Sequence, residues 1–275
     1  RDVVVDAPNN RALVSDNALD AVLAVDLTTG NRTVISQFST STGTGPDFGN
    51  PTHFALDAAN QRLLVACYEK FSVFAMDLLT GDRSVISSNA TTAGPLFVRQ
   101  RGIVLQASEQ RALVVDTDGQ ALLSVDLSPA VGDRTYLSNS TLDIGAGVAF
   151  GTNITDVVVD ATNNRALSSD SDTDTIYTID LETGNRLAIS DNTGTGNGPL
   201  FSSIGPIALD EGNNRLLVAE TSSEKLFAID LLSGDRTVIS DFSGVGTGPW
   251  SGTAQERDMA LDAANDRVLV VMSEA

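Results

Sequence analysis

A unit of about fifty residues recurs along this chain, and it constrains the fold more than any other feature. Six segments align closely: VVVDAPNNRALVSD (3–16), FALDAANQRLLVAC (54–67), IVLQASEQRALVVD (103–116), VVVDATNNRALSSD (157–170), IALDEGNNRLLVAE (207–220) and MALDAANDRVLVVM (259–272). Each consists of a short apolar run, a polar turn and a second apolar run. This pattern predicts a β-hairpin.

A second hairpin follows each of the first five segments: AVLAVDLTTGNRTVIS (21–36), SVFAMDLLTGDRSVIS (72–87), ALLSVDLSPAVGDRTYLS (121–138), TIYTIDLETGNRLAIS (175–190) and KLFAIDLLSGDRTVIS (225–240). Four antiparallel strands per unit predict an all-β fold, a β-propeller of four-stranded blades. The expected blade units are 3–36, 54–87, 103–138, 157–190, 207–240 and 259–275, within one domain, 1–275. We expect six blades with the last incomplete; the alternative is a five-bladed ring with an extra hairpin.

The turns repeat their chemistry from unit to unit. A glycine precedes each fourth strand, where a tight turn favours positive φ: Gly30, Gly81, Gly132, Gly184 and Gly234. An aspartate closes most first strands and every third strand, and an arginine follows each turn. Residues that recur in every blade are best interpreted as turn caps and ion pairs.

The motifs L-D-x-x-x-x-R and D-L-x-[ST]-G-x-R resemble those of six-bladed propellers such as NHL-repeat proteins, gluconolactonase-like lactonases and YVTN-type surface propellers. The resemblance covers nearly the whole chain and implies the fold, not a function. Lactonases of this group hold a metal with Glu, Asn and Asp residues on inner strands. Only the Asp component has counterparts here, Asp156 and Asp258, and no Glu stands at an equivalent strand entry.

The charge balance limits the classes of molecule that the protein is expected to bind. The chain has 36 acidic and 17 basic residues, a net charge of -19, which argues against nucleic acid or an anionic membrane surface and favours cationic groups. The remaining partners are a small molecule, a carbohydrate or a protein. No run of eighteen apolar residues occurs, and the single Cys67 forms no intramolecular disulfide. A chain that begins with Arg1 is expected to be processed or partial, and we expect a bacterial protein that is periplasmic, secreted or at the cell surface.

A propeller places the loops between blades, and the loops between second and third strands, on one face. The acidic residues outside the repeated turns concentrate in the second of these loop types. Near the expected axis, four residues before each first-strand Asp, the units carry Asp2, His53, Gly102, Asp156, Pro206 and Asp258, with Arg101 beside them. Three carboxylates and the only His would hold a cation or a polar substrate there. The alternative is an axial ion-pair cluster or a water-filled channel.

Two further features bear on ligands. Asp170, Asp172 and Asp174 form a D-x-D-x-D run, but Thr175 and Leu181 stand where an EF-hand needs Gly and Glu, so only a looser calcium site or a solvated loop remains. Four interblade loops carry Gly-Pro followed by an aromatic residue: Phe48, Phe97, Phe201 and Trp250. We interpret these rings as plugs that pack each loop on its blade, with ligand stacking as the alternative and Trp250 as the contact to test.

The sequence leaves two functions open. The first is an exported scaffold that recognises a ligand through its acidic loop face, with a cation bound on the axis. The second is a calcium-dependent, lactonase-like hydrolase in which an axial Ca²⁺ polarises a carbonyl. The tentative metal ligands are Asp156, Asp258, Asp170, Asp172 and Asp174. No catalytic residue is identified, no cofactor other than Ca²⁺ is expected, and the sequence does not decide whether the protein is an enzyme.

Overall fold

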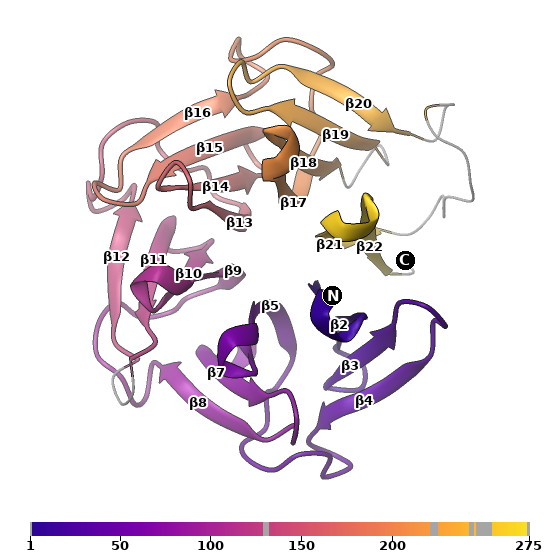
Figure 1. Cartoon of the computed structure of the whole chain (residues 1–275). Helices are drawn as coiled ribbons and strands as arrows, with labels where there is room; N and C mark the ends of the chain where they lie inside the picture. The colour runs from indigo at the N-terminus through magenta and orange to yellow at the C-terminus, as the bar shows by residue number, and fades with distance from the viewer. Residues whose placement is uncertain (1, 129–131, 221–224, 242–244, 246–254, 274–275) are drawn as a thin grey trace. The chain divides into compact units, whose positions relative to one another are not determined.

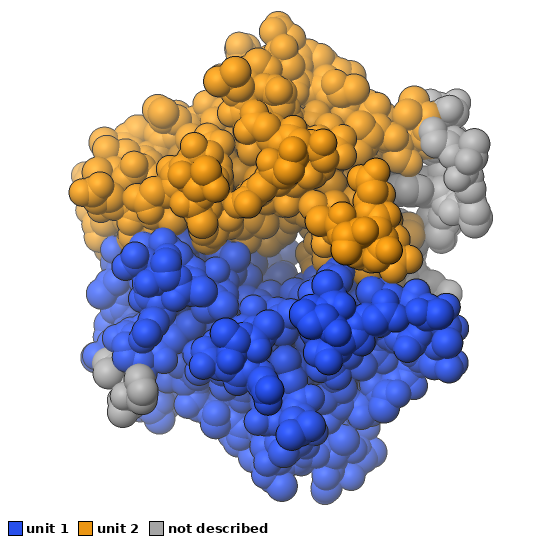
Figure 2. Space-filling model, in the orientation of Figure 1, with its two compact units in different colours: residues 1–136 blue, residues 137–275 orange. Residues whose placement is uncertain are grey.

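The computed structural model describes residues 2–128, 132–220, 225–241, 245 and 255–273, except for the side chains of 255–257 and 273. The chain divides into two compact units, Arg1–Tyr136 and Leu137–Ala275, which have different colours in Figure 2. Both units consist of antiparallel sheets whose strands follow one another in sequence order.

Unit 1 contains three four-stranded sheets, called blades 1 to 3 (Figure 1). Blade 1 is β1 (Val3–Asp6), β2 (Arg11–Asp16), β3 (Ala21–Asp26) and β4 (Arg32–Gln37). Blade 2 is β5 (Pro51–Asp57), β6 (Arg62–Cys67), β7 (Ser72–Asp77) and β8 (Arg83–Ser88). Blade 3 is β9 (Gln100–Gln106), β10 (Arg111–Asp116), β11 (Ala121–Asp126) and β12 (Arg134–Asn139), and β12 crosses the boundary into unit 2.

Unit 2 contains two further four-stranded sheets and one sheet of two strands. Blade 4 is β13 (Ile154–Asp160), β14 (Arg165–Asp170), β15 (Thr175–Asp180) and β16 (Arg186–Ser190). Blade 5 is β17 (Ile204–Asp210), β18 (Arg215–Glu220), β19 (Lys225–Asp230) and β20 (Arg236–Ser240). The two-stranded sheet is β21 (Gln255–Asp262) and β22 (Arg267–Ser273).

All predicted hairpins are confirmed, but the predicted count of six blades is not. The structure has five four-stranded blades, and the sixth unit of the repeat forms only the β21–β22 hairpin among the described residues. The repeat pattern marks hairpins, so six aligned first hairpins do not by themselves establish six four-stranded sheets. The prediction of one domain stays a prediction.

The first turn of five of the six repeats is closed by the Asp–Arg ion pair that the sequence predicted. In blade 1, Arg11 Nε donates to Asp6 Oδ2 at 2.7 Å, and Asn9 Nδ2 donates to the same carboxylate at 2.9 Å. The pair recurs at the first turn of blades 2, 4 and 5 and of the β21–β22 hairpin. In blade 3, Gln106 Oε1 replaces the carboxylate and accepts from Arg111 Nε at 2.7 Å. Left-handed residues such as Asn10, with φ 49°, complete these turns.

In blade 1, the turn between the third and fourth strands is capped by the aspartate that ends the third strand. Asp26 Oδ1 accepts hydrogen bonds from the main-chain N–H groups of Thr28 and Thr29, at 2.9 and 2.7 Å. Gly30 then adopts φ 72°, a conformation that costs an ordinary side chain energy. These hydrogen bonds favour the charged carboxylate and lower the pKa of Asp26.

The cores lie between neighbouring blades of each unit. In unit 1, β1 lies beside β5 and β5 beside β9; in unit 2, β13 lies beside β17 and β17 beside β21. The clusters between them consist of Leu, Val, Ile and Phe side chains, such as Leu63, Phe74 and Met76 between blades 1 and 2. Each fully buried side chain of this kind contributes about 1.5–3 kcal/mol of transfer free energy.

Candidate functional site

The loops between blades are fastened by the arginines that begin the fourth strands. Arg134 of blade 3 reaches beneath the loop that arrives from blade 2, where Nη1 donates to Ser87 Oγ at 2.8 Å and Nε donates to the main-chain oxygen of Pro95. Arg83, Arg186 and Arg236 make the same contacts with the corresponding serine and loop carbonyls. The prediction that these arginines form ion pairs at the turns is wrong for these four, because each side chain lies buried under a loop of the preceding blade. We call each of them a clasp arginine.

An aromatic ring from the loop completes each clasp. The guanidinium of Arg134 lies 4.6 Å from the centre of the Phe97 ring, and Phe97 is 2% exposed. Phe48, Phe150 and Phe201 are placed in the same way and make edge contacts with Phe74, Tyr177 and Phe227. The interpretation of Phe48, Phe97 and Phe201 as plugs is confirmed. Trp250 lies outside the described residues.

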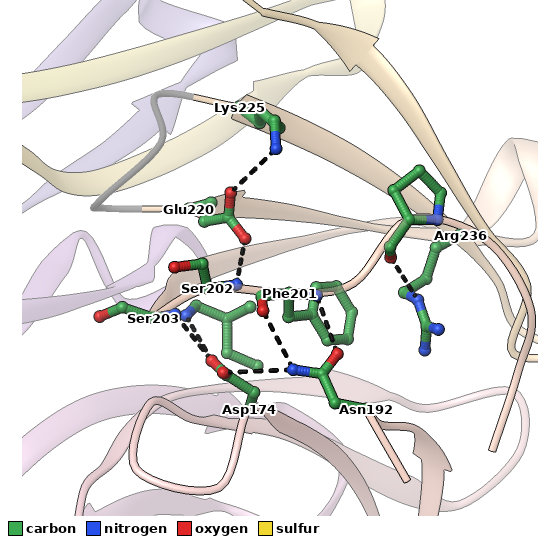
Figure 3. Close-up of polar contacts among 10 residues, drawn as sticks. Asp174, Asn192, Phe201, Ser202, Ser203, Glu220, Lys225 and Arg236 are labelled. Atoms are coloured by element: carbon green, nitrogen blue, oxygen red, sulfur yellow. Dashed lines mark hydrogen bonds and ion pairs between the residues drawn. The ribbon is translucent and has the colours of Figure 1, made fainter. Parts of the chain in front are cut away.

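Acidic residues of the loops between second and third strands hold the interblade loops from the other side. In unit 2, Asp174 Oδ1 accepts from the Ser203 main chain at 2.8 Å, and Glu220 accepts from the Ser202 main chain (Figure 3). Asn192 binds both main-chain polar groups of Phe201, at 2.8 and 3.0 Å. Asp116 in unit 1 likewise accepts from the Val98 and Arg99 main chains. These contacts place the interblade loops and the loops between second and third strands on one face of each unit, as predicted. Many carboxylates on that face therefore have a structural role.

The tentative calcium loop directs its three carboxylates to different partners. Asp170 Oδ1 accepts from the main chains of Asp172 and Thr173, whereas Asp172 Oδ2 accepts from the Thr152 hydroxyl at 2.8 Å. Asp174 holds the 203–204 main chain instead. Burial raises the pKa of Asp170, opposed by its main-chain hydrogen bonds. Across the described part of the chain, no group of three His, Cys, Asp or Glu side chains is placed to hold a metal ion.

A β-bulge lies at or just before the predicted axial position in four of the first strands, whereas β1 pairs with β2 in unbroken register. The register of β13 shifts between Ile154 and Asp156, and the same kind of shift occurs in β5, β17 and β21 just before or at the equivalent residue. A bulge bends its strand and redirects the side chain that follows it. The axial residues are therefore set by local backbone geometry as well as by residue type.

In unit 1 the predicted axial residues are Asp2, His53 and Arg101. Asp2 is 4% exposed, and its carboxylate accepts from the main-chain N–H of Phe54 on the first strand of the next blade. Its own main-chain N–H donates to Ser15 Oγ at 2.8 Å. His53 and Arg101 occupy partly buried positions on β5 and β9. Asp2 thus joins the first strands of blades 1 and 2.

In unit 2 the pair Asp156 and Asp258 is the most unusual electrostatic feature. Asp156 Oδ2 accepts from the Ile207 main chain of β17 at 2.9 Å, and Oδ1 accepts from its own neighbour Val157 at 2.7 Å. Asp258, on β21, is 7% exposed. Asp156 is partly exposed, but protein atoms surround it densely. The loss of water around its carboxylate is the larger cause, and the charge of Asp258 the smaller, of a rise in the pKa of Asp156 to about 8. The structure therefore brings this part of the predicted site together in one unit.

Sequence reasoning missed three groups of residues. The clasp arginines were assigned to turns because a repeat alone does not show which blade a long side chain reaches. Phe150 was missed because its loop, AGVAF, lacks the proline of the others. Gln100 was missed as well: it is 1% exposed, no described group hydrogen-bonds its amide, and Ile154 and Ile204 occupy the equivalent strand starts.

Cys67 was interpreted as a buried apolar residue, and this is confirmed. It is fully buried at the end of β6, and burial raises the pKa of its thiol well above the ordinary value. Such a thiol is not a nucleophile at neutral pH.

Comparison with known proteins identifies the fold but no family. No family model matches the chain, and no curated protein matches it. Among solved structures, one titled a nidogen/laminin complex superposes with a TM-score of 0.70 at 11% identity, covering 95% of this chain and 85% of that chain. A protein of unknown function from Bacteroides thetaiotaomicron has a TM-score of 0.70 at 14% identity, covering 100% and 66% of the two chains. An auxiliary nutrient binding protein from the same organism has a TM-score of 0.69 at 8% identity, covering 98% and 65%.

These superpositions, with the repeated four-stranded sheets, show that the chain is a β-propeller, and the NHL-repeat type fits at the level of the fold. Within the described residues, no helix is both long and apolar enough to cross a membrane.

Proposed function

We propose that this protein is a binding scaffold that recognises a ligand through its loop-bearing face and holds a cationic group at Asp156 and Asp258. The fold supports the first part, since two similar structures are titled a nutrient binding protein and a protein complex. The ligand class stays a small molecule, a carbohydrate or a protein. Export by a bacterium, an acidic recognition surface and completion of β21–β22 into a sixth blade belong to the same proposal.

The single observation that carries the cationic part is the placement of two carboxylates in unit 2, Asp156 against the main chain of β17 and Asp258 at 7% exposure on β21. Burial and the charge of Asp258 raise the pKa of Asp156 to about 8. Two like charges held together in a poorly solvated position cost free energy, which a proton relieves at low pH. A metal ion such as Ca²⁺, or the ammonium or guanidinium group of a ligand, would relieve the same cost by replacing that proton. Cation affinity is therefore expected to rise as the pH rises through about 8.

The experiment is thermal melting of the whole chain at pH 6 and pH 9, with CaCl₂, with EDTA, and with putrescine as an organic cation. A saturating cation that binds the native state raises the melting temperature by mass action, by several degrees at about a hundred times Kd. We expect at least one probe to do so, more strongly at pH 9, and we expect Asp156→Asn with Asp258→Asn to abolish the shift.

The matched control is Asp118→Asn, because the Asp118 side chain is 50% exposed and lies in unit 1. This variant removes a surface charge and should keep the full shift. A shift of equal size in the double variant, or no shift with either probe at pH 9, contradicts the cationic site.

A further inference from the structure

The turn between β6 and β7 of blade 2 exposes two aromatic rings. Tyr68 and Phe71 are 40% and 38% exposed, and their ring centres lie 5.9 Å apart with the ring planes at 78°. Aromatic side chains bring a large apolar area, which a folded protein usually covers. Blade 2 lies between blades 1 and 3 of the same unit, so the surroundings of this turn belong to unit 1.

The corresponding turns of blades 1, 3 and 4 show that an aromatic residue is poorly suited to this place. The last residue of the turn is left-handed in all four blades, with φ between 45° and 49°: Asp20, Phe71, Gln120 and Asp174. An aspartate tolerates this conformation, whereas a bulky side chain in it is strained because its Cβ approaches the main chain. Phe71 therefore stands where local geometry favours a small or polar residue.

The turn of blade 2 also lacks the cap of its counterparts. In blades 1, 3 and 4 an aspartate ends the second strand and accepts main-chain N–H groups of the turn; Asp16 Oδ1 accepts from Ala18 and Leu19, at 2.9 and 3.1 Å. Cys67 stands there in blade 2, and its side chain makes no capping hydrogen bond. Two locally unfavourable residues thus occur in the turn that exposes two rings, and such departures concentrate at functional positions.

Contacts with the interblade loops before and after blade 2 hold this turn in place. Lys70 Nζ lies 3.3 Å from Asp47 Oδ2, and a Cβ atom added to Gly49 would lie 2.2 Å from Lys70 Cε. On the other side, the Phe71 main-chain oxygen accepts from the Asn89 N–H at 3.2 Å. The rings are therefore presented on a fixed main chain, which lowers the entropic cost of binding a ligand.

The polar residues between the two rings offer both hydrogen-bond donors and acceptors. Glu69 Oε1 accepts from Asn50 Nδ2 at 3.1 Å, and the Lys70 ammonium pairs with Asp47. Since each carboxylate has a donor beside it, these groups suit a neutral ligand with hydroxyl groups better than an ion. A sugar ring has hydroxyl groups at its edge and polarised C–H bonds on its face, and the negative face of an aromatic ring attracts those C–H bonds.

We propose that Tyr68 and Phe71 form a stacking site for a neutral carbohydrate on the loop-bearing face of unit 1. A ring stacks on the C–H face of a sugar residue, and Glu69 and Lys70 exchange hydrogen bonds with its hydroxyl groups. This inference rests on the recognition part of the proposed function and selects carbohydrate from its ligand classes. It uses no residue of the proposed cationic site.

The test is native gel electrophoresis of the whole chain through gels that contain soluble starch, xylan, mixed-linkage β-glucan or galactomannan at increasing concentration. We expect saturable retardation by at least one of these neutral polysaccharides, and we expect Tyr68→Ala to weaken the affinity about tenfold or more. Leu79→Ala is the matched control, because Leu79 is an 85% exposed apolar residue just beyond the other end of β7. This variant should be retarded as the unchanged chain is.

Phe71→Gln separates binding from stability, because glutamine is the residue at this position in blade 3. The variant should lose affinity for the polysaccharide as Tyr68→Ala does, yet melt at the temperature of the unchanged chain or above it. A fall of several degrees in its melting temperature would show that the ring holds the turn, and it would overturn the proposal.

The other outcomes separate this inference from the proposed function. No retardation by any of the four polysaccharides overturns the carbohydrate site and leaves the cationic site standing, whereas retardation without a melting shift from Ca²⁺ or putrescine removes only the cationic site. Equal retardation of Tyr68→Ala supports recognition by the protein but overturns this site. Self-association that Tyr68→Ala abolishes, seen by analytical ultracentrifugation, also overturns it, because the rings would then contact a second copy of the chain.

Discussion

At the residue scale, the same side-chain type has different roles according to its hydrogen bonds and its burial. Asp26 at an exposed turn accepts two main-chain N–H groups, and its pKa falls. Asp156 also accepts two main-chain N–H groups, but desolvation and the charge of Asp258 outweigh them, and its pKa rises. The sequence located both residues from their places in the repeat, yet it did not distinguish their electrostatics, because burial depends on the neighbouring blades.

The buried amide of Gln100 gives a prediction at this scale. Replacing Gln100 by Ile, the residue at the start of β13 and β17, removes polar atoms that lack described partners and fills the site with apolar atoms. We expect the free energy of unfolding to rise by about 1–2 kcal/mol, measured by chemical denaturation. Gln106→Leu is the control: it breaks the 2.7 Å hydrogen bond to Arg111 and should destabilise the protein. A loss of stability in Gln100→Ile would show that the amide is satisfied by water or a ligand.

At the scale of elements, the hairpins were predictable, but the contacts that hold the interblade loops on the blades were not. Alternating apolar residues, positive-φ glycines and turn aspartates mark β1 to β22 from local sequence alone. The partners of a clasp arginine lie far away in sequence, as Arg134 and Ser87 show, so no local pattern reports them. Three of the four aromatic plugs, Phe48, Phe97 and Phe201, were predictable because a large apolar ring in a polar, glycine-rich loop must find cover.

The clasps give a prediction for which the chain contains its own control. Arg134→Ala removes hydrogen bonds to Ser87, Ser88, Thr92 and Pro95 and leaves buried carbonyls without donors. We expect a loss of about 3 kcal/mol or more in the free energy of unfolding. Arg32→Ala, at the equivalent but exposed position, should change stability by less than about 0.5 kcal/mol. Equal effects of the two substitutions would contradict the clasp.

At the scale of the whole molecule, the fold class followed from the repeat, whereas the number of blades and the site did not follow in full. Five four-stranded sheets formed where two hairpins were visible in each repeat, and the sixth repeat stayed a hairpin. Of the residues predicted at the axis, Asp156 and Asp258 interact in unit 2. The tentative calcium ligands Asp170, Asp172 and Asp174, which were predicted in a loop, hold main-chain and hydroxyl groups of loops instead. A net charge of -19 predicted cationic partners but not where they bind, because many carboxylates are occupied by main-chain N–H groups.

The raised pKa of Asp156 makes stability depend on pH in a defined direction. An ordinary aspartate has a pKa of 3.8, and Asp156 has a pKa of about 8 in the folded protein, so the folded state binds more protons between these values. Its contribution to stability therefore falls as the pH rises from about 4 to about 8. Denaturation at several pH values should show this slope, reduced in Asp258→Asn.

The most direct test of the cationic site is an NMR titration of the Asp156 carboxyl carbon in the whole chain. The account predicts a pKa near 8, which falls towards the ordinary value of 3.8 in Asp258→Asn and also falls when a saturating cation occupies the site. An Asp156 carboxyl that titrates near 3.8 in the unchanged protein, and does not respond to Asp258→Asn or to cations, would contradict it.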